Sequence, residues 1–226
     1  MKTITVKGVG KVSAPVDTVE LSFRIWEKDK AYETALKGAS DKVDALERAL
    51  VRSDFPKEDF QAEGFHVNTE YEGVRDENGD YRNVFAGYVC TYEQRLRFDF
   101  DVARLSKALN AVARSKSQPE LNVSFTVKQP ELLQAQLLED AAASARTRAE
   151  ILCRASGMKL GGLQTVEYDV SHLNFRSNTM MEVADCAMPM MASGSAKRSM
   201  AANFRPQDID LQDSAVFVWE LLPLED

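Results

Sequence analysis

The hydrophobic pattern of this 226-residue chain switches repeatedly between two periods, and this switching constrains the fold more than any other feature. Apolar residues alternate with polar ones from Val19 to Ile25, whereas over residues 29–52 they recur every three or four positions. The first pattern is typical of a half-buried strand and the second of an amphipathic helix. Elements that each bury one face pack in layers around a core. The chain is therefore expected to be an α+β protein.

Three helices are predicted, at residues 29–52, 101–115 and 130–156. Asp101 is the expected N-cap of the second helix, because its carboxylate accepts a hydrogen bond from a backbone N–H of the first turn. Pro130 suits the first turn of the third helix, and a glycine suits the position just past its end. The residues expected to face the core are Ala35, Ala39, Val43, Leu46 and Leu50 in the first helix, Leu105, Leu109 and Val112 in the second, and Leu138, Ala142, Ala145, Ala149 and Leu152 in the third.

The remaining periodic segments are predicted strands, at residues 2–12, 19–25, 61–100, 121–127, 163–170 and 209–221. Residues 61–100 form one long hairpin, because Asn78-Gly79 is a strong turn signal between two alternating segments. Gly8 and Gly10 indicate a bulge or a close approach of another backbone to the first strand. The expected architecture is a mainly antiparallel twisted sheet, with the three helices packed on one side and the hairpin protruding.

One domain spanning residues 1–226 is expected from the length. Two interlocked subdomains, about 1–100 and 101–226, are the alternative. Residues 171–206 follow neither period, and a loop of this length in a compact domain is usually functional or disordered. We predict a flexible loop here. It holds six of the eight methionines of the chain: Met180, Met181, Met188, Met190, Met191 and Met200.

The net charge of −7 and the sequence pI near 5.1 argue against two kinds of partner. Nucleic-acid binding relies on a basic surface, and so does docking on an anionic membrane. No stretch approaches the ~20 apolar residues of a membrane helix, so membrane insertion is not expected. The first residues look like a strand rather than an apolar leader, which favours a cytoplasmic location. Export is the alternative if a leader has been removed.

No motif with the spacing of a catalytic, cofactor or metal site stands out in the sequence. Cys90, Cys153 and Cys186 are odd in number and far apart, which fits neither a disulfide framework nor a C-x-x-C site. His66 and His172 lack partners at metal-binding spacing, and His66 is expected on the polar side of the hairpin. The acidic hairpin tip is read as a solvated turn. We therefore expect no enzyme activity, no cofactor and no metal.

Four segments resemble the SIMPL-domain family, in the same order along the chain. The start, Ile4 to Val12 followed by Ala14-Pro15 and Asp17, is similar to the start of SIMPL proteins, although the turn reads Pro-Val-Asp rather than Pro-Asp. The other three segments are Gly87-Tyr88 leading into Asp101 to Leu105, the helix Ala141 to Ala155 running into Gly157 to Gly161, and the methionine-rich loop before Asp208 to Leu211. The resemblance implies an α+β fold, a tendency to form large oligomers and no established enzymatic chemistry. It also implies a link to stress tolerance, and its bacterial members are commonly exported.

The expected function is a non-catalytic, oligomeric scaffold or assembly protein, and a further protein partner is compatible with this role. Free strand edges at residues 2–12 or at the C-terminal strand are expected to accept a strand from another copy. The hairpin is also expected to self-associate, since a two-stranded ribbon is marginal alone. Its apolar residues are Phe65, Val67, Tyr71, Phe85, Tyr88 and Tyr92.

The alternative function is a ligand- or metal-binding module that uses residues 177–200. Methionine thioethers bind Cu(I), and Met188, Met190 and Met191 lie close to Cys186 in the sequence.

Overall fold

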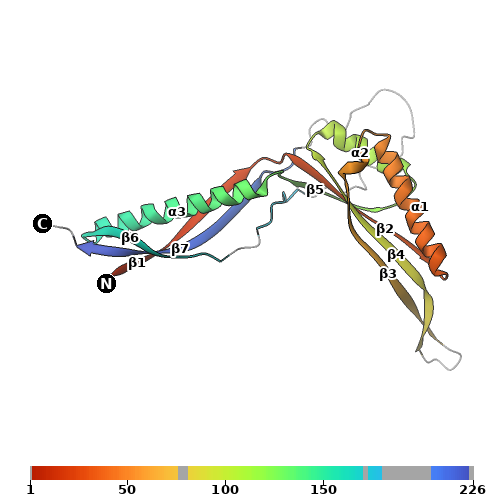
Figure 1. Cartoon of the computed structure of the whole chain (residues 1–226), viewed down its shortest axis with the longest axis horizontal. Helices are drawn as coiled ribbons and strands as arrows, with labels where there is room; N and C mark the ends of the chain where they lie inside the picture. Colours follow the sequence, from red (N-terminus) through yellow and green to blue (C-terminus); the bar gives the residue numbers. More distant parts are fainter. Residues whose placement is uncertain (1, 76–80, 170–172, 180–204, 224–226) are drawn as a thin grey trace. The chain divides into compact units, whose positions relative to one another are not determined.

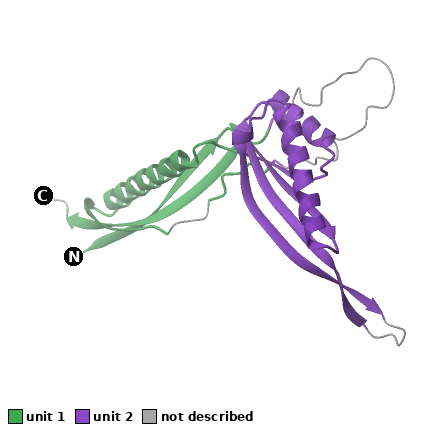
Figure 2. Ribbon diagram, turned by 45° about the vertical axis from the view of Figure 1, so that its right-hand side comes forward, with its two compact units in different colours: residues 1–17, 126–178, 206–226 green, residues 18–125, 179–205 purple. Residues whose placement is uncertain are grey.

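The structure is a computed structural model that describes residues 2–75, 81–169, 173–179 and 205–223. Within these ranges the order is β1 (Thr3–Ala14), β2 (Thr18–Asp29), α1 (Tyr32–Val51), a 3-10 turn (Lys57–Asp59), β3 (Phe60–Arg75), β4 (Tyr81–Asp99), α2 (Val102–Arg114), β5 (Glu120–Thr126), α3 (Pro130–Ala155), β6 (Met158–Glu167) and β7 (Ile209–Pro223) (Figure 1). Two compact units can be separated (Figure 2). Unit 1 comprises residues 1–17, 126–178 and 206–226, and unit 2 comprises residues 18–125 and 179–205. The expectation of one domain over residues 1–226 stays a prediction.

Each unit has its own sheet. Unit 1 has three strands in the order β1-β7-β6, and unit 2 has four in the order β3-β4-β2-β5. β7 runs antiparallel to both of its neighbours, and so does β4. The α+β prediction with antiparallel strands and three helices is confirmed. The strands divide between two sheets where the prediction had one, because β1 pairs with the distant β7 instead of with β2. Local periodicity carries no information about such long-range pairing.

The core of unit 1 lies between α3 and the strands β1 and β7. A Cβ atom at Gly8 would lie 2.0 Å from the carbonyl oxygen of Ala141, and one at Gly10 would lie 1.9 Å from that of Leu137. The predicted close backbone approach is therefore confirmed, and it is α3 that approaches. Buried residues of α3 recur every four positions: Leu137, Ala141, Ala145, Ala149 and Cys153.

Part of the predicted core stripe of this helix is wrong. Leu138 and Ala142 are only partly buried, and Leu152 is 49% exposed. The predicted stripe started one residue after the buried row, at Leu138, and left it again with a step of three to Leu152, whereas the row that packs on the sheet keeps a spacing of four. Pro130 opens the helix as predicted, and Gly157 follows its end with φ +65°.

The core of unit 2 lies between its sheet and the helices α1 and α2. All five α1 residues predicted to face the core are buried, and so are the alternating β2 residues Val19, Leu21, Phe23 and Ile25. Asp101 caps α2 as predicted, because its Oδ1 accepts a hydrogen bond from the Arg104 backbone at 2.6 Å. The helices and strands that position the functional surface are thus those that the sequence pattern indicates.

Candidate functional site

The face of the unit 2 sheet that turns away from α1 carries polar and charged side chains. In the β2–β4 register, Glu20 lies opposite Arg97, Ser22 opposite Arg95, and Arg24 opposite Glu93. Alternation along the strands sends these residues to one side and the apolar residues between them to the helices. We call this side the polar face.

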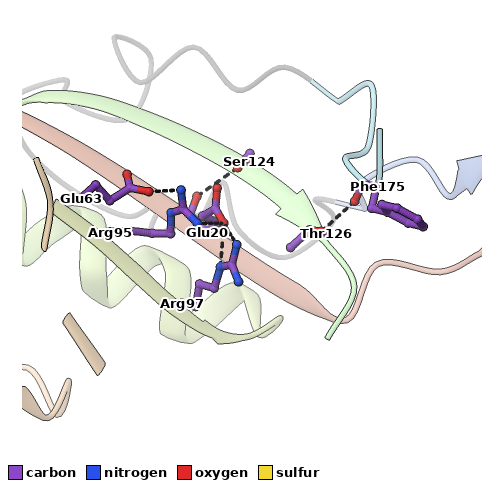
Figure 3. A network of polar contacts seen from close by, with 7 residues as sticks. All are labelled: Glu20, Glu63, Arg95, Arg97, Ser124, Thr126 and Phe175. Carbon is purple, nitrogen blue, oxygen red and sulfur yellow. Dashed lines mark hydrogen bonds and ion pairs between the residues drawn. The ribbon is translucent and has the colours of Figure 1, made fainter. Parts of the chain in front are cut away.

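Glu20 is the most deeply placed residue of the polar face, at 1% exposure. Its Oε2 accepts hydrogen bonds from Arg97 Nε at 2.7 Å and Nη2 at 2.6 Å, and Arg95 Nη1 lies 3.6 Å away (Figure 3). Arg95 also pairs with Glu63 from β3. A buried carboxylate is costly unless paired and hydrogen-bonded. The two guanidinium groups supply that pairing, so the cluster holds β2, β3 and β4 together.

A hollow of about 340 Å³ lies beside this cluster on the same face. Arg24 spans two of its carboxylates, at 3.7 Å to Glu93 and 3.9 Å to Glu120. These side chains are exposed, so the pairs contribute little to stability. The side chains that line the hollow are Ser22, Phe23, Arg24, Glu63, Glu93, Glu120, Leu121 and Asn122. Among the charged ones, Glu93 and Glu120 pair with Arg24, and Glu63 pairs with Arg95 of the neighbouring cluster.

Lys28 links the end of β2 to the hairpin. Its Nζ lies 2.9 Å from Glu70 Oε2 and 3.0 Å from Glu72 Oε1, both on β3. Hydrogen bonds to Glu70 and Glu72 raise the pKa of Lys28 above its ordinary value. The ammonium therefore stays charged near neutral pH and ties β3 to β2 across β4.

The hairpin carries exposed aromatic rings, which we call the hairpin surface: Phe65, Tyr71, Tyr81 and Phe85. Their exposed fractions lie between 37% and 71%. Tyr32, the first residue of α1, contacts Tyr88 with ring centroids 5.6 Å apart, and Tyr88 contacts Phe85 at 5.2 Å. The helix thus begins beside Tyr88, and the rings of Tyr71, Phe85 and Tyr81 nearer the hairpin tip continue the apolar face without a helix over them.

The free edges of the two sheets differ in how they are protected. β1 is an edge strand whose outer backbone is covered by α3: Lys11 N–H donates to Asp140 Oδ2 at 2.9 Å, and Lys7 O accepts from Arg148 Nη1 at 3.0 Å. β3 and β5 are the edge strands of unit 2, and no described residue hydrogen-bonds to the outer backbone edge of β3. The C-terminal strand β7 pairs on both sides. The prediction that it offers a free edge is therefore wrong.

The family model for SIMPL, described as a protein of unknown function (DUF541), matches residues 4–219. The chain belongs to the SIMPL family. It is similar to uncharacterized protein YggE of Edwardsiella ictaluri (strain 93-146), with 23% identity over 218 residues, which are 96% of this chain and 86% of that protein. It is also similar to uncharacterized protein YggE of Escherichia coli (strain K12), with 24% identity over 224 residues, which are 98% of this chain and 84% of that protein.

The candidate residues from the sequence are distributed as follows in this SIMPL chain. His66 lies opposite Thr91 in the β3–β4 register, on the polar side of the hairpin as predicted. Cys90 and Cys153 are free and buried. His172, Cys186, the six clustered methionines and the acidic tip at residues 76–80 lie outside the described residues.

Two further findings concern the described part of the SIMPL chain alone. Within it, no three His, Cys, Asp or Glu side chains come together in a way that could hold a metal ion. None of the helices found there combines the length and apolar character needed to cross a membrane.

Sequence reasoning missed the roles of Glu20 and Lys28. Glu20 was expected on the solvated side of β2 because it alternates with buried leucine and valine. The burial of Glu20 could have been inferred from its position opposite Arg97, but that position is known only when the pairing of β2 with β4 is known. Lys28 gave no signal at all, since its partners lie more than 40 positions away along the chain.

Proposed function

We propose that this SIMPL protein is a non-catalytic assembly protein whose copies associate through the unit 2 hairpin. The observation that carries the proposal is the hairpin surface, with Tyr71 at 58% exposure and Tyr81 at 71%. Monomeric proteins rarely expose adjoining apolar groups in this way, and such groups usually mark an interaction site. Aromatic side chains are also enriched in the buried cores of interfaces.

The arrangement of the polar face supports a non-catalytic role. Its most buried acid, Glu20, is paired with two arginines, Glu93 and Glu120 beside the hollow share Arg24, and Glu63 pairs with Arg95. A general acid or base must be able to exchange a proton with a substrate within hydrogen-bond reach. These groups are instead engaged in holding strands together.

Light scattering coupled to size-exclusion chromatography tests the proposal. We expect a mass above that of the monomer at tens of micromolar protein. The net charge of −7 opposes association of like copies, so association should tighten as salt screens that repulsion. A monomeric mass at both low and high salt contradicts the proposal.

Two further parts of the proposal concern the cellular role. A contribution to stress tolerance rests on the family resemblance, and a deletion strain under oxidative or heat stress tests it. A cytoplasmic location is supported by the unpaired thiols of Cys90 and Cys153, which suit a reducing compartment. Fractionation of cells that express the full reading frame tests the location, and recovery from outside the cytoplasm contradicts it.

A further inference from the structure

We infer that the outer edge of β3 pairs antiparallel with the same edge of a second copy, with the two Asn68 residues facing each other across a twofold axis. This inference rests on the proposed self-association and names the surface and register through which it occurs. The partner is therefore a second copy of this chain.

Protection of the other edges singles out β3. β1 is covered by Asp140 and Arg148. β6 is irregular, with two register shifts against β7. β5, the other edge of the unit 2 sheet, has seven residues, and its last residue, Thr126, bridges to Arg176. The end of β2 has Lys42 bonded to the carbonyl oxygen of Trp26 at 3.0 Å. Proteins block strand edges in these ways to prevent unwanted pairing.

β3 lacks such a device over most of its length. It is a strand of 16 residues, and its single extra residue against β4, Glu63, lies near its start. From Gly64 to Arg75 the strand carries no further bulge of its own, since the second register shift adds a residue to β4. An edge this long, regular and partly apolar is a ready template for another strand.

The register follows from the side chains along the edge. With Asn68 on the axis, His66 of one copy faces Glu70 of the other, and Phe65 faces Tyr71. Each of these pairs occurs twice, because a twofold interface is self-complementary. Opposed polar or oppositely charged pairs and aromatic pairs stabilise neighbouring antiparallel strands. A shift of the axis by two residues one way would place Glu70 opposite Glu70, which like charges disfavour. A shift of two residues the other way would place Phe65 opposite Val67 instead of Tyr71 and so lose the aromatic pairs.

The same register explains why Phe65 and Tyr71 remain exposed at 46% and 58% in a single copy. Both lie on the face of β3 that α1 covers further along, as their partners Tyr92 and Phe85 do. A second copy would set one ring beside the other in each half of the interface. Apolar surface on both sides of Asn68 would then be buried together.

A single cysteine tests the register in the full chain. Cys186→Ser is the background, so that the added thiol and the buried Cys90 and Cys153 are the thiols present. In antiparallel strands, directly opposed residues have Cα atoms about 5 Å apart, within the range that a disulfide spans. Asn68→Cys is therefore expected to form a linked dimer under mild oxidation. Glu72→Cys is the matched control on the same strand and face, because its two copies would be about 27 Å apart at ~3.4 Å per residue.

We expect linkage of Asn68→Cys to be at least about tenfold faster than linkage of Glu72→Cys, because assembly raises the effective thiol concentration. A mixture of His66→Cys and Glu70→Cys proteins tests the same register with Asn68 intact. It should link the two variants to each other faster than either links to itself. Equal rates in both experiments overturn the inference.

The mass of each reduced variant, measured by light scattering, separates this inference from the proposed function. Reduced protein that associates but links no faster than the control retains the proposed assembly and excludes this surface. Reduced protein that is monomeric at all concentrations and salt levels removes both.

Discussion

The two units cover their sheets to different extents. In unit 1, α3 has 26 residues and spans about 39 Å, close to the ~41 Å of the 12-residue β1. In unit 2, α1 has 20 residues and spans about 30 Å, whereas the 19-residue β4 spans about 65 Å. The aromatic rings of the hairpin beyond Tyr32 therefore have no helix of their own unit. This length difference concentrates the candidate interaction surface on unit 2.

The largest effect on stability is expected from breaking the ion pair between Glu20 and Arg97 on the polar face of unit 2. Arg97→Ala leaves the Glu20 carboxylate, 1% exposed, with the more distant Arg95. We expect the free energy of unfolding to fall by about 3 kcal/mol, the low end for breaking a buried ion pair, because Arg97 itself is half exposed. Chemical denaturation measures the change.

The matched control for this prediction removes both charges, in Glu20→Gln with Arg97→Gln. Because neither charge is then left unpaired, the double variant should lose less stability than Arg97→Ala alone. A double variant that is no more stable than the single one would show that Arg97 acts through packing rather than charge.

The second prediction tests how closely α3 packs on β1 in unit 1, by comparing a glycine-to-alanine substitution there with the same substitution in unit 2. Gly10→Ala places a Cβ 1.9 Å from the Leu137 carbonyl oxygen, so α3 must move, at a cost of about 2–3 kcal/mol. Gly73→Ala, on the hairpin of unit 2, meets its nearest atom at 3.8 Å and should change stability by less than about 0.5 kcal/mol. Thermal and chemical unfolding of both variants check the difference. Equal losses would contradict the contrast between the units.

A smaller effect concerns the buried carboxylate of unit 1. Asp213 is 3% exposed, and its Oδ2 accepts a hydrogen bond from the Tyr168 hydroxyl at 2.9 Å. Tyr168→Phe removes this donor and should lower the free energy of unfolding by about 1 kcal/mol near neutral pH. Asp213 keeps a backbone donor, Ser214 N–H, at 2.7 Å, so the loss stays small.

The same pair predicts a pH dependence with a definite sign. The hydrogen bond to Asp213, followed by burial, raises the pKa of Tyr168 above 10.0. Its contribution to stability is therefore complete below pH 10 and is lost as pH rises through the higher pKa of the folded state. Tyr168→Phe should show a weaker loss of stability above pH 10 than the parent protein. An equal loss of stability above pH 10 in the variant and the parent protein would contradict this.

The smallest effect on stability is expected at the hairpin surface. Tyr71→Ser together with Phe85→Ser removes two rings that are 58% and 37% exposed. The free energy of unfolding of the monomer should change by less than about 1 kcal/mol. The dissociation constant of self-association should rise about tenfold, because the rings lie in the proposed interface. Sedimentation equilibrium measures the association. Leu132→Ser on α3, 57% exposed, is the control in unit 1 and should leave association unchanged.

The elements that the sequence predicted well are those whose information is local. The α1 stripe from Ala35 to Leu50 is correct because its polar and apolar sides differ clearly. In α3 the small residues occur on several sides of the helix, so Leu152 was assigned to the core although Cys153 occupies it. Composition alone cannot choose between adjacent rows of alanines.

The information that was missing is the pairing of distant segments. The edge position of β1, the central position of β7 and the burial of Glu20 all depend on contacts between residues far apart in sequence. The exposed rings at Tyr71 and Phe85 were found from the sequence, because their number exceeds what a two-stranded ribbon can bury. Their register with a second copy becomes visible once β3 is known to be an edge.

The covering of β1 by α3 also fixes which parts of the chain tolerate insertions. Asp140 and Arg148 are eight residues apart, about 12 Å along a helix, and they bond to Lys11 and Lys7, four residues or about 13 Å apart along a strand. One extra residue between them would rotate Arg148 by roughly 100° away from its carbonyl partner. The hairpin of unit 2, by contrast, can lengthen by a residue on each strand without disturbing the pairs nearer α1. Length variation among relatives should therefore collect in the hairpin and spare this stretch of helix.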